Sequence, residues 1–245
     1  MNLVIDVGNT RLKYAFFHLG EMRIKGVGME ELFRTITDVR KEHEVHVFLS
    51  GSGKIEEDLR MRLRREAVFW LEASPGLLLP LEIGYNTPVT LGFDRIAICT
   101  AARRIYPAGR LLVIDTGTAF TYNYVENGVF LGGNISPGLE MRFRALHAFT
   151  EKLPYVEARG TCTDCGRDTE EAIRNGVVNG MVFEVKGYID DFFRYTSEGQ
   201  VVITGGSLCL LEKLQGERIH FEESLGMIGL NLSLIHISEP TRRRG

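Results

Sequence analysis

Apolar residues recur in two spacings along the chain, and each spacing predicts a different element. Short apolar runs bounded by Gly or charged residues are typical of buried strands, and residues 2–27 contain three such runs joined by tight turns. Apolar side chains at helical spacing among charges predict a helix from Met29 to Glu44, and a very charged helix is expected from Lys54 to Arg65. With further strands at 45–49 and 68–71, the order βββαβαβ predicts a mixed sheet that begins antiparallel and ends with parallel crossovers.

The second half of the chain repeats the opening pattern. Leu3 to Thr10 and Leu112 to Thr118 each combine an apolar run, a carboxylate and a Gly flanked by hydroxyl or amide side chains. A hydrophobic stretch, a turn and another strand-like segment follow both copies, and such repetition suggests two domains of similar build. We therefore expect an α/β protein with an N-terminal domain at 1–108, a C-terminal domain at 109–231 and a nucleotide cleft between them.

Further elements are expected after the second copy. Glu126-Asn127-Gly128 is typical of a hairpin turn, and Gly132 to Gly138 predicts a rigid loop that enters a helix at Leu139. Pro154 ends this helix, and a long helix is expected from Thr169 to Tyr195. The remaining predictions are a helix at 96–105, a strand at 201–204 that ends in a glycine turn, a strand at 218–221, and helices at 207–214 and 227–231.

Residues 232–245 differ in character from the rest of the chain. After Leu-rich turns, the sequence ends in Ser238-Glu239-Pro240-Thr241-Arg242-Arg243-Arg244-Gly245 and resembles a translated sequencing adaptor. We therefore exclude this tail from the predicted fold as non-native. A basic anchor is the alternative interpretation.

The two acidic turns have the chemistry of a phosphate site. Because Gly8 and Gly117 lack Cβ, a phosphate can approach the backbone N–H groups at both turns. Asn9, Thr10 and Thr118 can add side-chain donors, whereas the aspartates repel phosphate and can instead hold a cation that binds it. The alternative is a buried strand that ends in a capped turn, and the occurrence of a matching pair argues against it.

A third aspartate stands at the start of a predicted helix, in Gly92-Phe93-Asp94-Arg95. Backbone N–H groups at a helix start and the Arg95 guanidinium favour anions, while Asp94 can accept a proton. The alternative is an N-capping Asp with a surface Arg, which is common. Spacing alone favours this alternative.

Two other motifs do not meet the requirements of their chemistry. Ser50-Gly51-Ser52-Gly53-Lys54 resembles a P-loop, but Phe48 replaces the first Gly and Ile55 follows the Lys. Cys162-Thr163-Asp164-Cys165 lacks the two further ligands that zinc needs and the strand–helix setting of redox motifs. We interpret these two cysteines as incidental loop residues.

Composition limits the remaining possibilities. The 245 residues are 44% hydrophobic and carry a net charge of -3, so no general attraction to nucleic acid or membrane is expected. Met1 runs directly into the first strand, so we expect no signal peptide, and no apolar run approaches the ~18 residues of a membrane span. Four cysteines are too few for a disulfide scaffold, so a cytoplasmic location is expected.

The motifs together, in this order, resemble type III pantothenate kinase. The resemblance covers residues 2–231 and is carried by 6–10, 92–95, 115–119, 132–138 and 204–206, and by the similar stretches Ala145-Leu146-His147, Leu153-Pro154 and Thr169 before Ala172-Ile173. It implies the fold of the acetate/sugar kinase–chaperone–actin superfamily, with two ribonuclease-H-like domains built on mixed five-stranded sheets. It also implies ATP-dependent phosphorylation of pantothenate to 4′-phosphopantothenate, the first step of coenzyme A biosynthesis. The implied cofactors are ATP, Mg²⁺ and K⁺ or NH₄⁺, and the implied assembly is a homodimer.

The resemblance also assigns roles residue by residue. Asp94 matches the proton acceptor, Asp115 the monovalent-cation ligand and Thr118 an ATP contact. The substrate contacts are Tyr85, Gly92, Phe93, Asp94, Arg95 and Thr169. The first phosphate loop is Asp6, Val7, Gly8, Asn9, Thr10, Arg11, Leu12 and Lys13, and Gly205 and Gly206 have the form of a backbone floor under adenine.

Two other functions stay open at this point. One is a related kinase that acts on a different small hydroxylated substrate. The other is a non-enzymatic nucleotide-binding regulator, because transcriptional activators resembling this family exist, although the intact Asp94 and Asp115 argue against it. One departure from the family is Asn123, where many relatives carry Asp.

Overall fold

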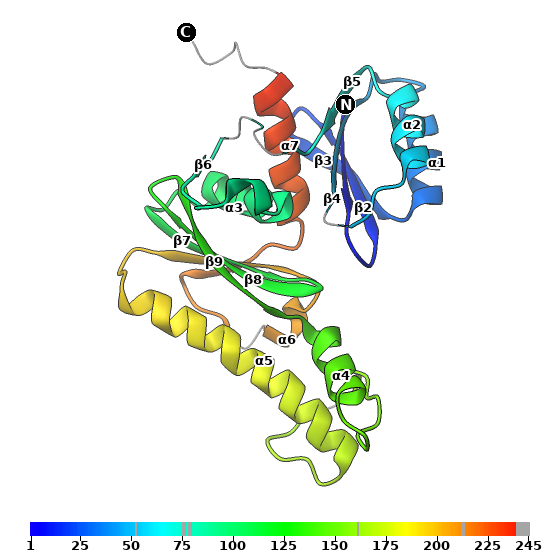
Figure 1. Cartoon of the computed structure of the whole chain (residues 1–245). Coiled ribbons are helices and arrows are strands. Elements are labelled where there is room, and N and C mark those ends of the chain that lie inside the picture. The colour runs from blue at the N-terminus through cyan, green and yellow to red at the C-terminus, as the bar shows by residue number, and fades with distance from the viewer. Residues whose placement is uncertain (52, 75–76, 78–79, 161, 212–213, 239–245) are drawn as a thin grey trace. The chain divides into compact units, whose positions relative to one another are not determined.

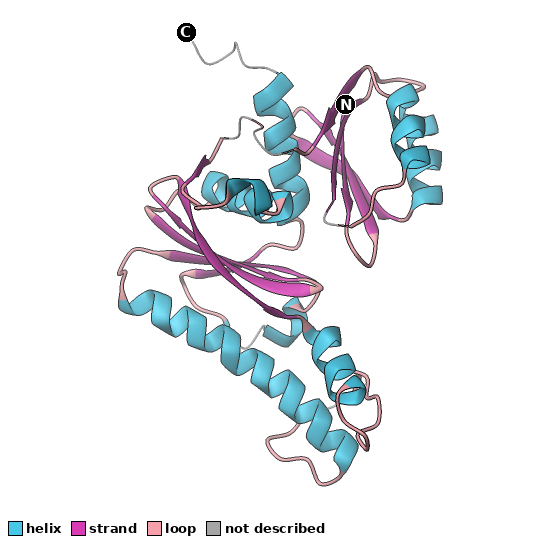
Figure 2. Ribbon diagram, viewed as in Figure 1, coloured by secondary structure: helices cyan, strands magenta, loops and turns pink. Residues whose placement is uncertain are grey.

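The computed structural model shows an α/β protein with two mixed sheets (Figures 1 and 2). It describes residues 1–238 except 52, 75, 76, 78, 79, 161, 212 and 213. The chain divides into two compact units: the first comprises Met1–Pro107, Gly128–Phe130 and the segment from Ser224 onward, and the second the residues 108–127 and 131–223. The assignment of separate functions to 1–108 and 109–231 stays a prediction.

The first sheet confirms the predicted order βββαβαβ. Strand β1 pairs antiparallel with β2 and parallel with β4, which gives the spatial order β3-β2-β1-β4-β5. The elements of the first unit are β1 (Asn2–Val7), β2 (Leu12–His18), β3 (Glu21–Val27), α1 (Met29–Val39), β4 (His46–Gly51), α2 (Glu57–Glu66), β5 (Phe69–Glu72), β6 (Glu82–Ile83), a 3-10 turn (Pro88–Thr90), α3 (Phe93–Ile105) and α7 (Leu225–Ser238).

Helices cover both faces of this sheet because successive side chains of a strand point to opposite sides. Leu3 and Ile5 of β1 are fully buried under α1 and α2, whereas Val4 between them packs in a core with residues of α3 and α7 (Figure 1). The carboxyl end of β1 is thereby fixed on both sides, and the first acidic turn starts there.

The second sheet has the spatial order β11-β10-β7-β8-β9-β6. It contains six strands instead of the expected five because the short β6 pairs parallel with the start of β9, at Ile83 and Phe130. The remaining elements are β7 (Arg110–Thr116), β8 (Ala119–Glu126), β9 (Val129–Pro137), α4 (Leu139–Ala148), α5 (Thr169–Arg194), β10 (Gln200–Gly205), α6 (Leu208–Leu211) and β11 (Ile219–Phe221).

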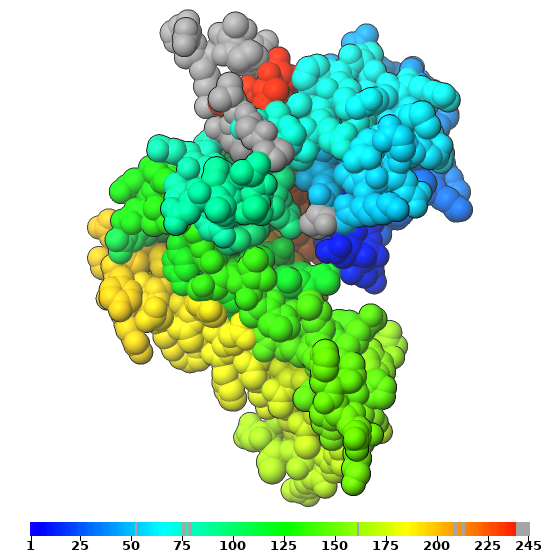
Figure 3. All heavy atoms as spheres, in the orientation of Figure 1, coloured from blue at the N-terminus to red at the C-terminus, as the bar shows by residue number. Residues whose placement is uncertain are grey.

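Helix α5 covers one face of the second sheet with its carboxyl-terminal half. Met181, Val185 and Ile189 are buried against β7 and β8 side chains. The amino-terminal half of α5 packs instead with α4 and the loop between them, around the buried Phe143, and these segments form one packed lobe (Figure 3). The 26-residue helix therefore joins the sheet to this lobe.

Several predicted boundaries are wrong. Helix α1 ends at Val39, not Glu44, because Val39 is the last buried apolar side chain on its inner face. Helix α3 begins at Phe93 instead of residue 96, so Asp94 and Arg95 lie inside its first turn. The predicted loop from Gly132 continues as strand β9 to Pro137.

The carboxyl-terminal helix is longer than predicted. Helix α7 runs through Ser238, beyond the expected end at Asn231. Ser233 and Leu234 are fully buried, and Leu234 shares the core cluster of Val4. Excluding residues 232–238 from the fold was therefore wrong, while 239–245 lie outside the described residues.

Candidate functional site

The first acidic turn lies where β1 ends and β2 begins. The Gly8 N–H donates to the Arg11 carbonyl at 3.1 Å and closes the turn. Asp6 is partly buried opposite Lys13 in the β1–β2 pair, whereas Asn9 and Thr10 are exposed. Exposed amide and hydroxyl groups above a closed backbone turn are suited to contact an anion.

Gly51 and Gly53, from the stretch that does not match a P-loop, pack against this turn. The Gly53 N–H donates to the Val7 carbonyl at 3.0 Å, and a Cβ on Gly53 would lie 2.9 Å from the Gly8 carbonyl oxygen. A Cβ on Gly51 would be equally close to the Val7 oxygen. Gly51 and Gly53 are therefore packing residues of the first acidic turn, a role that the pairing of β1 with β4 creates and the sequence did not indicate.

The charge of Asp94 acts on Asp6 within the first unit. Burial and, to a smaller extent, the charge of Asp94 raise the pKa of Asp6, Lys13 lowers it, and the combined effect is a pKa of about 6. Two carboxylates from distant parts of the sequence therefore interact electrostatically, while their shared role in one site stays a prediction.

The local geometry around Asp94 fixes its carboxylate. The Arg95 N–H donates to Asp94 Oδ1 at 2.8 Å in the first turn of α3. A Cβ on Gly92 would lie 2.4 Å from the same oxygen, so only Gly leaves room for this orientation. Asp94 is not the N-cap, which is Gly92, so the capping alternative is wrong.

Arg95 is not a surface residue. It is only 6% exposed, and its guanidinium carbon lies 5.5 Å from the Phe130 ring centroid and 6.0 Å from that of Tyr85. Tyr85 in turn packs edge-to-face on Phe130. The structure therefore brings Tyr85 together with Arg95, while the role of these residues as substrate contacts stays a prediction.

The second acidic turn is tied to the strand that follows α5. Thr204 lies beside Asp115 in the parallel β10–β7 pair, and the Thr116 hydroxyl donates to the Thr204 carbonyl at 2.8 Å. Gly205 has a φ of 109°, and a Cβ there would lie 2.6 Å from Asp115 Oδ1. The structure thus places Gly205, one of the two glycines predicted to lie under adenine, directly against the predicted cation ligand.

Gly138 supports the same turn from the other side. Its N–H donates to the Thr118 carbonyl at 3.2 Å, and a Cβ on Gly138 would lie 2.2 Å from that oxygen. A Cβ on Gly117 would lie 3.4 Å from Asp115 Oδ2. The turn from Asp115 to Thr118 is therefore held on two sides by glycine contacts.

Thr169 is the one predicted substrate contact that belongs to the second unit. It opens α5 directly after Asp168, the N-cap, whose side chain accepts from the Glu171 N–H at 2.9 Å. Tyr85 and the Gly92–Arg95 turn belong to the first unit. The role of Thr169 in substrate binding stays a prediction.

Asn123 has a structural role in the second sheet. It is fully buried, and its side-chain amide donates to the Val113 carbonyl and the Thr121 hydroxyl, both at 3.0 Å. A carboxylate could not donate to either acceptor. Asn123, which departs from the family pattern, is therefore a hydrogen-bonding residue in the interior of the sheet.

The described cysteines form no disulfide. Cys99 is buried, while Cys162 and Cys165 are exposed. Thr163 between them is held by α5, because Asn175 accepts from its N–H at 3.1 Å and Asn179 donates to its carbonyl at 3.0 Å.

Two further features are absent from the described residues. No group of three or more His, Cys, Asp or Glu side chains is placed to hold a metal ion. Within the same residues, every helix is too short or too polar to cross a membrane.

Comparison with known families identifies relatives over nearly the whole chain. The family model described as type III pantothenate kinase matches residues 2–191. The chain is 39% identical to a type III pantothenate kinase of Cytophaga hutchinsonii, over 94% of this chain and 97% of the relative. It is 37% identical to one of Phocaeicola vulgatus, over 94% of this chain and 96% of the relative.

Solved structures share the fold at low sequence identity. A Baf-family transcriptional activator from Campylobacter jejuni superposes with a TM-score of 0.60 at 20% identity, covering 97% of this chain and 98% of that one. The ADPNP-bound activator of a 2-hydroxyisocaproyl-CoA dehydratase from Clostridium difficile gives a TM-score of 0.56 at 12% identity, covering 98% and 97%. These likenesses show the fold alone.

Proposed function

The chain belongs to the type III pantothenate kinase family, and from this premise we propose how its residues carry out the ATP-dependent phosphorylation of pantothenate. That reaction transfers the terminal phosphoryl group of ATP to a hydroxyl of pantothenate and opens coenzyme A biosynthesis. Because its transition state spreads charge over the phosphoryl oxygens, catalysis depends mainly on positioning and electrostatics.

Asp94 is the proposed proton acceptor. The observation that carries this assignment is the fixed carboxylate of Asp94 in the first turn of α3, where a Cβ at position 92 would lie 2.4 Å from its Oδ1. Asp94 is also oriented by the Arg95 N–H at 2.8 Å, which leaves its second oxygen to orient the attacking hydroxyl. The hydroxyl proton passes to Asp94 late in the transfer.

Pantothenate is proposed to bind at Tyr85, Gly92, Phe93 and Arg95, with a further contact from Thr169. Arg95 is a buried cation beside two aromatic rings, and such a charge favours an anionic ligand. The pantothenate carboxylate and the phosphoryl group in transfer are both anions, and the Arg95 guanidinium can bind either of them.

The ATP phosphates are proposed to bind the first turn. The backbone and side chains from Val7 to Lys13 hold the phosphate oxygens, and Asp6 orients the magnesium that ATP carries, through water. Thr118, Gly205 and Gly206 of the second unit contact the remainder of the nucleotide.

A monovalent cation is proposed at Asp115. The surroundings fit such an ion, because the Asp115 carboxylate lies against the backbone at Gly117 and Gly205, and oxygen ligands suit a hard cation. No set of three acidic, His or Cys side chains surrounds it in the described chain, which disfavours an all-side-chain divalent site. When bound, the cation supplies charge that offsets the phosphate.

A homodimer in the cytoplasm is proposed as the working form. Ile135 of β9 is 65% exposed and Phe183 of α5 is 70% exposed, both in the second unit. These two side chains are the positions that we expect a second copy to cover.

Release of ADP on addition of pantothenate tests this function. We expect ADP only when the enzyme, ATP, Mg²⁺ and pantothenate are all present, with a faster rate in K⁺ or NH₄⁺ than in Na⁺. A panel of other small alcohols is the control, and activity toward one of them without activity toward pantothenate would assign a different acceptor. DNA binding without any ADP release would instead indicate a regulator.

A further inference from the structure

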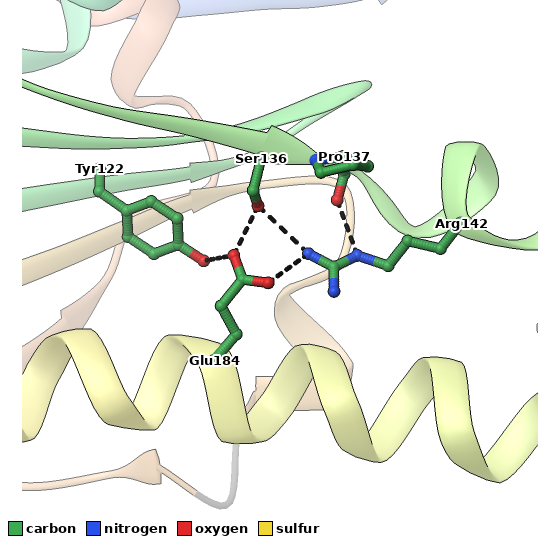
Figure 4. Close-up of polar contacts among 5 residues, drawn as sticks. All are labelled: Tyr122, Ser136, Pro137, Arg142 and Glu184. Atoms are coloured by element: carbon green, nitrogen blue, oxygen red, sulfur yellow. Dashed lines mark hydrogen bonds and ion pairs between the residues drawn. The ribbon is translucent and has the colours of Figure 1, made fainter. Parts of the chain in front are cut away.

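A polar network in the second unit lies next to the second acidic turn but contains none of the residues assigned above. Glu184 of α5 accepts from the Tyr122 hydroxyl at 2.7 Å and from the Ser136 hydroxyl at 2.5 Å (Figure 4). Arg142 of α4 donates to the other Glu184 oxygen at 2.5 Å. Its Nε donates to the Pro137 carbonyl at 2.7 Å.

The members of this network are largely removed from water. The side chains of Arg142 and Glu184 are 19% and 25% exposed, and Tyr122 is fully buried and stacked on Tyr188 at 3.7 Å between ring centroids. Burial alone would raise the pKa of Glu184, but hydrogen bonds from Ser136, Tyr122 and Arg142 hold that pKa below its ordinary value. Glu184 is therefore a charged acceptor that three donors keep in one position.

The network ends at the corner where β9 meets α4. Arg142 and Glu184 hold Ser136 and the Pro137 carbonyl, and the next residue is Gly138. The Gly138 N–H donates to the Thr118 carbonyl, and no Cβ could fit between Gly138 and that oxygen. A displacement of this corner must therefore displace Thr118 as well, because close-packed backbone transmits strain.

We propose that Glu184 is a positioning residue for nucleotide binding, acting through Arg142 and the Ser136–Gly138 corner on the turn at Gly117 and Thr118. The inference rests on the proposed function, in which that turn contacts ATP. The inference extends that function by naming a charged pair, Arg142 and Glu184, that determines affinity for ATP but not for pantothenate.

Substitution Glu184→Gln tests the proposal. It preserves the size of the side chain but removes the charge, and it directs either an oxygen or an amide at the Arg142 guanidinium. We expect the KM for ATP and the dissociation constant of ADP, measured by calorimetry without turnover, to rise roughly tenfold, as losses of supporting contacts at ligand sites do. The KM for pantothenate should stay within about twofold.

A matched control lies on the same helix. Lys186 and Asp190 form an exposed ion pair on α5, with side chains 56% and 51% exposed. Asp190→Asn also removes a carboxylate charge from α5 but leaves the network intact, so its ADP affinity should equal that of the unmodified enzyme. The double variant Arg142→Met/Glu184→Gln should weaken ADP binding little more than either single change, because both changes act on the same corner.

The outcomes separate the inference from the function on which it rests. Folded Glu184→Gln with unchanged ADP affinity overturns the positioning role, as does an equal rise in both KM values. If that variant does not fold, Ser136→Ala removes one contact to the same corner and should raise the ADP dissociation constant by a factor of about two to five, and an unchanged value would overturn the proposal. Failure of the unmodified enzyme to phosphorylate pantothenate overturns the function instead.

Discussion

The position of Asp6 predicts that the enzyme is more stable without it. The pKa of this carboxyl rises from an ordinary 3.8 to about 6 because it is buried and faces Asp94. Between these two values the folded protein binds more protons than the unfolded chain, so its free energy of unfolding falls as pH rises. The stability associated with protonated Asp6 is complete below pH 3.8 and is lost as the pH passes 6.

The size of the effect follows from the shift. A difference of about two pKa units corresponds to about 3 kcal/mol, and screening at a partly exposed carboxylate reduces this to about 1–3 kcal/mol. Asp6→Asn removes the charge but preserves the shape, so the variant should unfold with a free energy higher by about that amount at pH 8. At pH 5 the gain should be about half as large, since Asp6 is then partly protonated.

Urea denaturation followed by circular dichroism, without ATP or Mg²⁺, measures the gain at both pH values. Asp38→Asn is the control, because the Asp38 side chain is 65% exposed in an ion pair with Lys41 and its loss should change stability by less than about 0.5 kcal/mol. A gain that is absent at pH 8, or equal at the two pH values, would refute the reasoning. As an independent check, an NMR titration of Asp6 should give a lower pKa in Asp94→Asn.

Three further predictions concern single residues. Asp94→Asn should lower kcat by roughly 10²–10⁴-fold without changing ATP affinity, and near-normal turnover in an ADP-release assay would remove Asp94 from the mechanism. Asp115→Asn should abolish the stimulation by potassium over sodium, measured in the same assay, and persistent stimulation would contradict the cation assignment. Asn123→Asp should lower the free energy of unfolding by roughly 3 kcal/mol, because it buries a carboxylate against the Val113 carbonyl; thermal denaturation measures this, with Asn127→Asp in the exposed turn as the control.

Asp6→Asn and Glu184→Gln affect opposite kinds of interaction. Asp6 is a charge whose burial costs stability, and the proposed function explains why such a charge is present at a phosphate turn. Glu184 is a charge that accepts from three donors, so its removal leaves the largely enclosed Arg142 guanidinium without its carboxylate. Asp6→Asn should therefore stabilise the fold and abolish activity. Glu184→Gln should lower both the stability of the fold and the affinity for nucleotide.

The strand pattern and the acidic turns can be predicted from the amino-acid sequence without any tertiary information. Alternation of apolar and polar residues specifies which strand faces are buried, and the predicted strands of the first sheet, the hairpin at Asn127 and the long α5 are confirmed. The motifs around Asp6, Asp94 and Asp115, taken in order with the other stretches, also indicated the family, although each motif alone is a weak signal.

Which of these residues act on one another depends on how the chain packs in three dimensions. The interaction of Asp6 with Asp94, the packing of Gly53 behind Gly8 and the support of Thr118 by Gly138 all join residues that are distant in sequence. No local pattern encodes such contacts, because they arise from strand register and from how closely two backbones approach. The same reason explains the misplaced end of α7, since the burial of Leu234 depends on a surface formed by β1 and β4 and not on its own neighbours.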